Sequence, residues 1–562
     1  MIYQEIDTKI NYSRENLHWN AWGAIDQDFF HISKIQHILE YLSTTLEMSS
    51  LPNTPSVEIE DLKIPKSKIT PSDKRAIVAK LNPHGNKKVI NSRHEIVLHS
   101  VGRSYYDVIR LRTNKIKNFV DLVIYPHNLK DIEQVLKWAM LKKIAIVPFG
   151  GGSSVVGGLE AIKTKGQKAV ISLDLTRLDK LIEINETDRT ATFEAGIYGP
   201  KLEQALNAKG YTLGHFPQSF EYSTLGGWVA ARSAGQQSNK YGSIETLVAN
   251  LEIITPAGVI KSLDFNHIAN GPDTNQIFTG SEGLLGIITQ VKVKVSRLPK
   301  ERTYFAFMVE SFLLGCELVK NISQNNIPVS MARLSDEAET IQFETLASLG
   351  KDTSKVKSII QDLVLKKKNL YHSRCLLIIG LEGDKHITAF HKKSIQFLAK
   401  TYGALYLGEK AGKNWLKGRF NMPFLRNHLL DYGIAVDTLE TSCNYSKAKI
   451  VHKEVVQALK KATGGTVLCH LSHSYHDGAC LYFTVIYEMD LKNPIKQWQK
   501  LKKDASDVLI KNGVSMSHHH GIGVDHKPWY QKQLSPALLK SLKQIKKTLD
   551  VKNIMNPGKL FD

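Results

Sequence analysis

The pattern of apolar and polar residues predicts alternating helices and strands from about Asn118 onward. Apolar residues recur at helical spacing within Leu129–Lys142, and the apolar run 144–147 that follows predicts a buried strand. Residues 247–255 and 259–263 flank a Pro-Ala-Gly turn, which indicates a β-hairpin. This part of the chain is therefore expected to pack helices against sheets.

The same analysis extends toward the C-terminal half. Strands are expected at 181–184 and 190–194 around a polar turn, and a helix at 200–208 ends before Gly210. Beyond a boundary at Leu298-Pro299, the expected strands are 303–309, 376–382 and 481–487, and the expected helices are 313–324 and 448–462. Such a mixture is typical of an α+β domain.

The length of the chain requires more than one hydrophobic core. With 562 residues and 63.1 kDa, two or three domains are expected. We divide the chain into a mostly helical N-terminal region with a linker, an α/β domain, an α+β domain and a C-terminal return segment, at 1–100, 101–298, 299–510 and 511–562. The tract 51–71, rich in Pro, Ser and Lys, is the expected linker.

The absence of targeting signals and the spacing of the cysteines indicate the cellular compartment. No run of about 18 apolar residues is present, the first residues lack a secretory pattern, and Lys-Leu-Phe-Asp at 559–562 is not a peroxisomal address. The five cysteines have no Cys-x-x-Cys spacing and are typical of reduced thiols. The sequence therefore predicts a cytoplasmic protein.

Net charge is the outlier of the composition. The formal charge is +20, and basic residues concentrate at 63–117, 351–368 and 492–559. Such charge attracts nucleic acid, anionic lipid or a phosphorylated substrate, and it is equally typical of a biased soluble surface. No zinc finger, RNP aromatic pair or GXXG clamp is present, so nucleic acid is not an expected partner. Peripheral contact with an anionic membrane is the preferred functional interpretation.

Two glycine-rich loops carry the strongest chemical signal. The run 148–155 reads Pro-Phe-Gly-Gly-Gly-Ser-Ser-Val, and a second loop within 215–242 is rich in Gly, Ser and Thr. Glycine lets backbone N–H groups approach phosphate oxygens, so the pair suits a cofactor with a central diphosphate. Neither loop is a P-loop or a dinucleotide-binding fingerprint, because the required Lys and Gly spacing is missing. A third glycine loop, 279–289, leads into an alternating strand.

These loops resemble the flavin-binding domain of the vanillyl-alcohol oxidase class. Together with Ser223–Trp228, the strand residues 478–483 and the run Ser517-His518-His519-His520-Gly521, the chain resembles the alkyldihydroxyacetonephosphate synthase family over about four-fifths of its length. The resemblance implies an α+β fold with a PCMH-type FAD-binding domain of two α/β subdomains, an α+β substrate (cap) domain and a helical N-terminal region. It also implies FAD as cofactor and a homodimer.

In that family the acyl group of 1-acyl-dihydroxyacetone phosphate is exchanged for a long-chain fatty alcohol, and a fatty acid is released. The reaction is formally non-redox, and FAD is a covalent handle on the substrate carbon. The implied partners are thus a phosphorylated lipid substrate and a fatty alcohol. Two other functions stay open: an FAD-dependent dehydrogenase or oxidase of glycerol 3-phosphate or a 2-hydroxy acid, and a basic lipid-surface protein that keeps flavin only structurally.

The resemblance assigns individual residues. Substrate binding falls to Arg333 and Arg426, and catalysis to Tyr482, His215, His518, His519 and His520. The residues at the family's FAD positions are Pro148, Phe149, Gly150, Gly151, Gly152, Ser153, Ser154, Gln218, Ser219, Ser223, Thr224, Ala231, Arg232, Ser233, Ala234, Glu282, Gly283, Leu284, Leu285, Gly286, Ile287 and Ile288.

Simpler interpretations stand beside these roles. A lone strand tyrosine usually has a satisfied hydroxyl, and lone arginines usually form surface ion pairs. Tyr482 has a free pKa of about 10, so it needs cationic neighbours to act as a base, and the three histidines with Arg426 are the expected source. On an extended strand, three consecutive histidines would alternate faces.

No metal site is expected. Related 2-hydroxy-acid dehydrogenases read Glu-His-Gly in this loop, and the Glu binds a metal with strand histidines, whereas this chain has His519 at that position and Tyr482 near a strand-histidine position. His470, His473 and His476 are interpreted as structural. The chain also departs from the family after His215, where Phe216-Pro217-Gln218 replaces an acidic pair, and over its first hundred residues.

Overall fold

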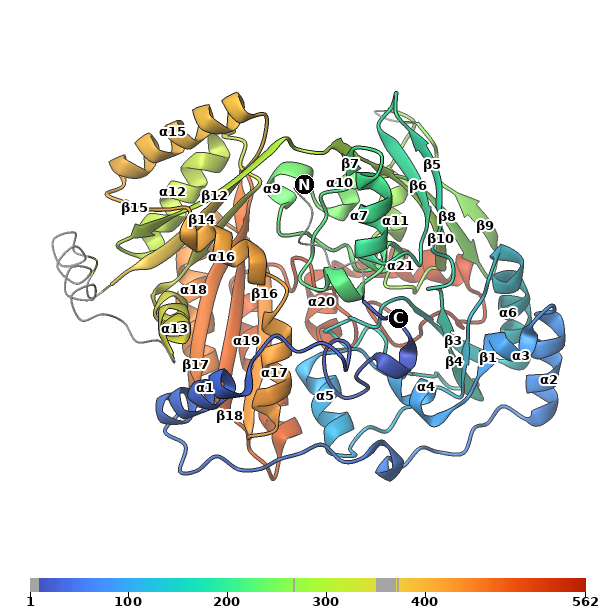
Figure 1. The fold of residues 1–562 in the computed structure, drawn as a ribbon. Coiled ribbons are helices and arrows are strands. Elements are labelled where there is room, and N and C mark those ends of the chain that lie inside the picture. Colours follow the sequence, from blue (N-terminus) through green and yellow to red (C-terminus); the bar gives the residue numbers. More distant parts are fainter. Residues whose placement is uncertain (1–9, 266–267, 350–369, 371–372) are drawn as a thin grey trace.

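The structure is a computed structural model that describes residues 10–265, 268–349, 370 and 373–562 (Figure 1). The basic run at 351–368 lies outside the described residues. Helices and strands alternate through the first half, and one large sheet with its helices makes up most of the second half. No helix within the described ranges is long and apolar enough to cross a membrane.

The first sheet has four strands in the order β1-β2-β4-β3, with β2 and β3 parallel to β4. Its strands are Val89–Ile90, Leu122–Ile124, Ala169–Asp174 and Ile144–Phe149. Helix α6 spans Leu129–Lys142 as predicted, and it begins at Asn128, whose side chain accepts the Asp131 N–H at 2.9 Å. The apolar face of α6 packs on this sheet.

The second sheet is antiparallel, with five strands in the order β5-β6-β10-β8-β9. Its strands are Leu181–Asn185, Thr190–Glu194, Ile287–Lys294, Val248–Thr255 and Gly258–Lys261. The predicted hairpin is confirmed as β8 and β9. Helices α7 and α8, Gly199–Asn207 and Leu225–Ala231, cover the core face of this sheet.

The third sheet has seven antiparallel strands in the order β15-β12-β14-β13-β17-β18-β16. They are Leu405–Gly408, Glu301–Val309, Cys375–Gly383, Met331–Ser335, Thr466–Ser474, Gly478–Glu488 and Ile434–Asn444. One face packs on α12, α15, α18 and α19, which span Phe312–Gln324, Lys385–Thr401, Tyr445–Thr463 and Pro494–Lys511. The predicted strands and helices of this half are therefore confirmed.

The opposite face of the third sheet carries the polar residues that matter below. It is partly covered by α16 and α17, Lys410–Gly418 and Met422–Leu430. Two residues of the second glycine-rich segment contact β17. The Asn239 side-chain amide donates a hydrogen bond to the Ser474 carbonyl, and the Gly235 carbonyl lies within hydrogen-bond distance of His473 Nε2. The two halves of the molecule therefore meet at this face.

The N-terminal region wraps around both halves (Figure 1). Its helices are α1 (Ile32–Thr45), α2 (Pro71–Lys80), α3 (Gly85–Lys88) and α4 (Arg93–Leu98), joined by irregular chain. Helix α5, Tyr105–Arg112, follows them. Helix α1 packs on α17 and the edge of the third sheet, so this region links the sheet to the first half.

The remaining elements are short helices near the loops, a helix on the second half, and the C-terminal segment. They are α9 (Ser238–Tyr241), α10 (Ile244–Leu247), α11 (Asn275–Phe278), α13 (Glu337–Ser348), α20 (Lys527–Gln533), α21 (Pro536–Leu549) and the β7–β11 pair, Tyr211–Thr212 with Ser296–Arg297. Met555 forms a parallel bridge with Ile146, so residues that follow α21 return to the first sheet.

Candidate active site

The first glycine loop has unpaired donors. No backbone N–H of residues 150–155 donates a hydrogen bond to another described residue. The glycines are needed for packing: a Cβ on Gly151 would lie 1.8 Å from the Tyr222 carbonyl oxygen, and one on Gly150 would lie 2.3 Å from Thr224 Oγ1. The loop is therefore pressed against the second loop with a row of free N–H groups, an arrangement that binds anions.

Arginines lie beside this loop. Arg103 lines a narrow pocket with Gly151 and Ser153, and within the described part of the chain its guanidinium donates only to the carbonyls of Gly102 and His18. Burial, with Arg14 and Arg426 nearby, lowers the pKa of Arg103 to about 10. A buried cation without a carboxylate hydrogen-bond partner, next to free N–H groups, fits the diphosphate of FAD.

Arg14 holds the same loop from the N-terminal side. Its guanidinium forms a buried ion pair with Asp174 and donates to the Gly150 carbonyl at 3.2 Å and to Tyr198 Oη at 3.1 Å. The region before α1, for which the sequence indicated no role, thus orients the first loop.

The second loop is built around a helix start. Thr224 is the N-cap of α8 and accepts the Gly227 N–H at 3.3 Å, while Ser223 Oγ accepts the Trp228 indole N–H at 2.6 Å. Both hydroxyls therefore position α8. The other predicted residues of this loop, Gln218 and Ser219, bond to the Arg419 carbonyl and to Ser223.

The third loop connects the other two to the histidine loop. The backbone N–H groups of Gly280 and Glu282 donate to the carbonyls of Val229 and Ala230, at the end of α8. Glu282 accepts the N–H groups of Ile522 and Gly523 at 2.6 and 2.8 Å. Burial raises the pKa of Glu282 to about 7 despite these bonds. Of the predicted FAD residues 282–288, Glu282 therefore contacts the segment that follows His520, while Gly283 lies against Pro148 of the first loop.

A row of polar side chains crosses four strands of the third sheet. Tyr482 on β18 is the cross-strand partner of Glu440 on β16 and of His470 on β17. The Tyr482 ring stacks on His470, with centroids 4.9 Å apart and planes 20° from parallel. His470 Nδ1 lies 2.9 Å from Glu339 Oε1 and 3.0 Å from Arg333 Nη2. The row therefore runs from Glu440 through Tyr482 to Arg333.

Glu440 organises the histidine loop. Its Oε1 accepts the Ser517 hydroxyl at 2.6 Å and the N–H groups of His519 and His520 at 3.1 and 2.9 Å, and its Oε2 accepts the His518 N–H. Residues 517–520 therefore turn around one buried carboxylate. The extended conformation considered from the sequence is absent from this segment, and all three rings lie near Tyr482 or His473.

The ionisation of these groups differs from the expectation. Burial lowers the pKa of His518 and of His519 to about 4, so both are neutral at neutral pH. Burial, together with the Glu440 and Asp437 carboxylates, raises the pKa of Tyr482. The expected positive field is therefore not supplied by histidines in the protein alone, and Tyr482 is held as a protonated phenol.

Cations near Tyr482 and the histidine loop come from other elements. Arg426 on α17 is half-buried, donates from Nη2 to the Arg103 carbonyl at 2.8 Å, and has an Nε without a partner among the described groups. Lys502 on α19 is buried, with Nζ 3.9 Å from Asp437 Oδ2. An open guanidinium edge of this kind suits an oxyanion. The Arg333 guanidinium, in contrast, already forms hydrogen bonds with Glu339, Ser335 and His470.

His215 lies apart from this group. It is fully buried, its Nε2 contacts Ser233 Oγ at 2.8 Å, and its ring packs on Trp228. Burial lowers the pKa of His215 to about 3. Its ring makes no contact with Tyr482 or with the histidine loop among the described interactions, so the structure places it in the second glycine loop.

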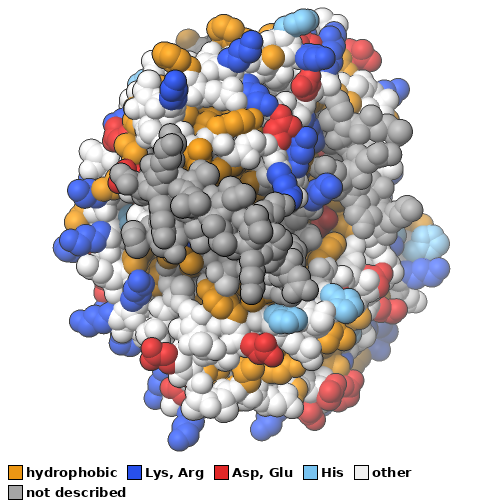
Figure 2. All heavy atoms as spheres, turned by 60° about the vertical axis from the view of Figure 1, so that its left-hand side comes forward, with side chains coloured by type: hydrophobic (Ala, Val, Ile, Leu, Met, Phe, Trp, Pro, Cys, Tyr) orange, Lys and Arg blue, Asp and Glu red, His pale blue; other side chains and the backbone are white. Residues whose placement is uncertain are grey.

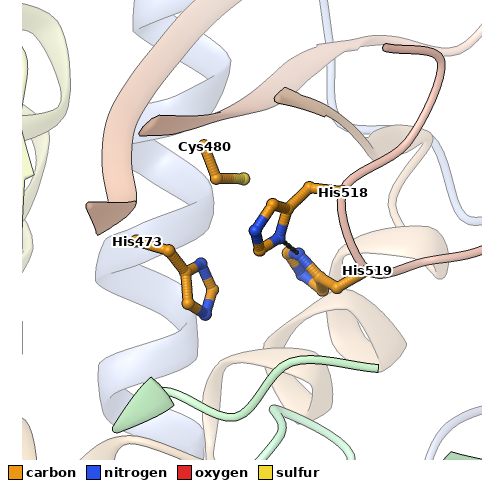
Figure 3. Close-up of side chains that lie close together, drawn as sticks. All are labelled: His473, Cys480, His518 and His519. Atoms are coloured by element: carbon orange, nitrogen blue, oxygen red, sulfur yellow. Dashed lines mark hydrogen bonds between the residues drawn. The ribbon is translucent and has the colours of Figure 1, made fainter. Parts of the chain in front are cut away.

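Two histidines of the loop meet residues of the β17–β18 hairpin. Figure 3 shows His473 and Cys480 facing His518 and His519, and one donor atom of each residue lies within 4.8 Å of those of the other three. The Nδ1 atoms of His518 and His519 are 3.0 Å apart. The sequence did not predict this grouping.

Several residues of the site were missed from the sequence. They are Arg14, Arg103, Glu440, Cys480 and Lys502. A signal existed for Glu440, because Asp437 and Glu440 place two carboxylates within one strand, and buried acids in a strand are rarely without a partner. For the others the sequence offers no comparable pattern.

Comparisons with known proteins agree with this geometry. The family models described as "FAD binding domain" and "FAD linked oxidases, C-terminal domain" match residues 120–264 and 298–560. An alkyldihydroxyacetonephosphate synthase of Dictyostelium discoideum is 31% identical and aligns over 97% of this chain and 94% of its own. That of Trypanosoma brucei brucei is 33% identical over 82% of this chain and 76% of its own.

A solved alkyldihydroxyacetonephosphate synthase has a similar structure. It is 29% identical, superposes with a TM-score of 0.83, and covers 97% of this chain and 99% of its own. The matches confirm the predicted α+β, PCMH-type fold and the FAD cofactor.

Proposed function

This chain belongs to the alkyldihydroxyacetonephosphate synthase family, and on that premise we propose that it forms the ether bond of ether lipids. The acyl group of 1-acyl-dihydroxyacetone phosphate is exchanged for a long-chain fatty alcohol, which gives 1-alkyl-dihydroxyacetone phosphate and a fatty acid. No net oxidation occurs, so no electron acceptor is consumed. FAD, when bound, supplies a covalent handle for the substrate carbon.

The observation that carries this proposal is the half-buried, protonated Tyr482, which lies in the row with Glu440 and His470 and close to Arg426. The Tyr482 phenol, which is protonated at neutral pH, donates a proton to the departing carboxylate as the bond between that carboxylate and the substrate carbon breaks. The phenolate that results accepts the proton of the incoming alcohol, which restores the phenol. The two transfers balance, so the residue leaves each cycle unchanged.

The anionic parts of the substrate need a cation. The free Nε edge of Arg426, near Tyr482, suits the phosphate or the departing carboxylate, because a guanidinium donates two parallel hydrogen bonds to one oxyanion. The remaining assignments, Arg333 for substrate and His215 with His518–His520 for catalysis, stay predictions. In the present geometry Arg333 acts on Tyr482 through His470.

One anaerobic incubation tests the function. Purified FAD-loaded protein is mixed with acyl-dihydroxyacetone phosphate and a labelled long-chain alcohol, without an electron acceptor, and the lipids are separated. Labelled ether lipid with an equal amount of fatty acid is expected. Absence of ether product, with flavin bleaching by glycerol 3-phosphate or a 2-hydroxy acid, would instead identify a dehydrogenase.

We also propose peripheral contact with an anionic membrane through α15. Ile387, Phe390 and Phe397 are exposed on this helix, Phe397 by 75%, and the exposed Lys385, Lys393 and Lys400 accompany them. Hydrophobic and basic side chains are intermixed on the face that Figure 2 brings forward, the side on which α15 lies in Figure 1. Exposed aromatics with lysines are typical of helices that bind anionic bilayers. The homodimer and the cytoplasmic location stay predictions.

A further inference from the structure

We propose that His473, Cys480, His518 and His519 bind one zinc ion in a closed, four-ligand site. Imidazole and thiolate are the donor types of structural zinc sites, and three histidines with one cysteine supply the four donors that such a site needs. One donor atom of each lies within 4.8 Å of those of the other three (Figure 3). Zinc–nitrogen bonds of about 2.0–2.1 Å and a zinc–sulfur bond of about 2.3 Å require tetrahedron edges of roughly 3.3–3.6 Å, so a small contraction completes the site.

A β-bulge is what brings the strand ligands together. His470 and His473 are three residues apart, so on a regular strand their side chains would point to opposite faces. The register between β17 and β18 shifts between Leu471 and His473, so His470 pairs with Tyr482 and His473 pairs with Cys480. Residues 480 and 482 share a face, and the bulge therefore places His473 and Cys480 side by side on it.

The two ligands from the histidine loop, His518 and His519, are also held in place by hydrogen bonds. Glu440 holds the backbone of residues 518–520, and it places His518 Nδ1 and His519 Nδ1 3.0 Å apart. That separation is close to one edge of a zinc tetrahedron. Two ligands therefore come from a rigid hairpin and two from a loop clamped by a buried carboxylate.

Hydrogen bonds to Nε2 of His473 and of His518 determine which ring nitrogen can bind the ion. His473 Nε2 contacts the Gly235 carbonyl at 3.1 Å, and His518 Nε2 contacts Tyr475 Oη at 2.7 Å, which leaves Nδ1 of each for the ion. Such contacts to the second nitrogen accompany metal-binding histidines. Ser472 Oγ, 2.7 Å from His473 Nδ1, must turn away when the ion binds.

The site has a consequence for its neighbours. Four protein ligands leave no position for water, so the ion fixes the loop and does not activate a nucleophile, and His518 and His519 then serve as its ligands in place of the proton-transfer roles that the resemblance implies. A divalent ion with one thiolate adds a net charge of about +1 next to Tyr482, whose ring stacks on His519. The inference does not depend on the proposed reaction, because occupancy is measured without turnover.

The test is metal content of the FAD-loaded protein after equilibration with zinc and removal of excess ion. We expect one zinc per chain, and less than a tenth of that in Cys480→Ala and in His473→Gln. Cys443→Ala, which removes a buried thiol of the same sheet outside the cluster, should keep full occupancy. Less than a tenth of an equivalent in the unmodified protein, or full zinc in Cys480→Ala, would overturn the proposal.

Cobalt provides a check that needs no variant. Cobalt(II) added to the metal-free, FAD-loaded protein should give intense visible bands of a tetrahedral thiolate complex at wavelengths longer than flavin absorption. Weak bands of an octahedral complex would exclude Cys480 as a ligand. Flavin content measured in the same samples distinguishes loss of zinc from loss of fold.

Discussion

Glu440 accepts the hydroxyl hydrogen of Ser517 at 2.6 Å, and this bond starts the turn of the histidine loop around one buried carboxylate. The same carboxylate accepts three successive backbone N–H groups. A side chain seventy-seven positions away in sequence thus determines where His518–His520 lie.

Glu440→Gln should destabilise the folded protein and slow ether-lipid formation. The amide offers one acceptor oxygen and turns an NH2 group toward backbone donors. Each buried N–H group that loses its acceptor lowers the free energy of unfolding by about 1–3 kcal/mol. We expect a loss of a few kcal/mol in urea unfolding of the FAD-loaded protein. Glu454→Gln, at an exposed pair with Lys511, is the control and should leave the unfolding midpoint unchanged. Equal midpoints for both variants would show that Glu440 does not hold the loop.

Tyr482→Phe should retain FAD and lose most turnover. Only the hydroxyl is removed, the stacking on His470 is preserved, and proton transfer by a positioned side chain contributes roughly 10²–10⁴-fold. Ether-lipid formation under substrate saturation, with flavin absorbance as the loading control, measures the effect. A rate within twofold of the unmodified protein would remove Tyr482 from the chemistry.

Substitution of Arg426 and of Arg333 should change different kinetic constants. Arg426→Lys replaces an open guanidinium fork by a point charge, so the apparent affinity for the phosphorylated substrate should fall about tenfold. Arg333→Lys breaks a bonded group that includes Glu339 and His470, so it should lower kcat more than affinity. Steady-state kinetics of both variants decide this. The opposite pattern would assign substrate binding to Arg333.

Asp525→Asn should stabilise the protein at neutral and alkaline pH. Burial, with Asp107 nearby, raises the pKa of Asp525 to about 8, and its Oδ2 has no partner among the described groups. Between about pH 4 and 8 the folded protein therefore holds a proton that the unfolded chain releases. Stability falls as pH rises through this window, by up to about 1.4 kcal/mol per unit.

Asp525→Asn removes this pH dependence of the free energy of unfolding. The gain in stability of the variant over the unmodified protein should be absent near pH 4, grow toward pH 8 and then remain constant. Asp504→Asn, at a partly exposed pair with Lys500, is the matched control and should show no such growth. A constant difference between Asp525→Asn and the unmodified protein from pH 5 to 8 would contradict the raised pKa.

Membrane contact can be tested on α15. Phe390→Ser with Phe397→Ser should lower co-sedimentation with anionic vesicles at least about tenfold, since each buried aromatic contributes roughly 1.5–3 kcal/mol. Leu141→Ser, on α6 and 78% exposed, is the control. Binding should also weaken with salt because of the lysines. Unchanged sedimentation of the double variant would place the membrane contact elsewhere.

The sequence was most informative where a local pattern determines structure. Helix α6 has the predicted bounds, because its apolar spacing and Asn128 cap are local features. The grouping of His473 with Cys480 was not predictable, because it depends on a bulge in the pairing of β17 with β18. The charge states were not predictable either, since burial lowers the histidine pKa values and raises that of Tyr482.

The resemblance supplied the residue roles that local patterns could not. It named Tyr482 and Arg426, and the structure places Tyr482 in the polar row of the third sheet and Arg426 close to it. It gave no reason to select Arg14 or Lys502, because a lone basic residue in a sequence with 74 of them is indistinct until its partners are seen.

The return of residues 553–562 to the first sheet constrains when the cofactor can be captured. Asn556 donates to the carbonyls of Gly158 and Glu282, and Lys559 donates to that of Glu160, 399 positions earlier. At roughly 5–20 residues per second, a ribosome makes these closing residues at least about 20 seconds after the first glycine loop. During synthesis the chain after the first glycine loop lacks these hydrogen bonds, so the complete site exists only once translation has passed residue 559.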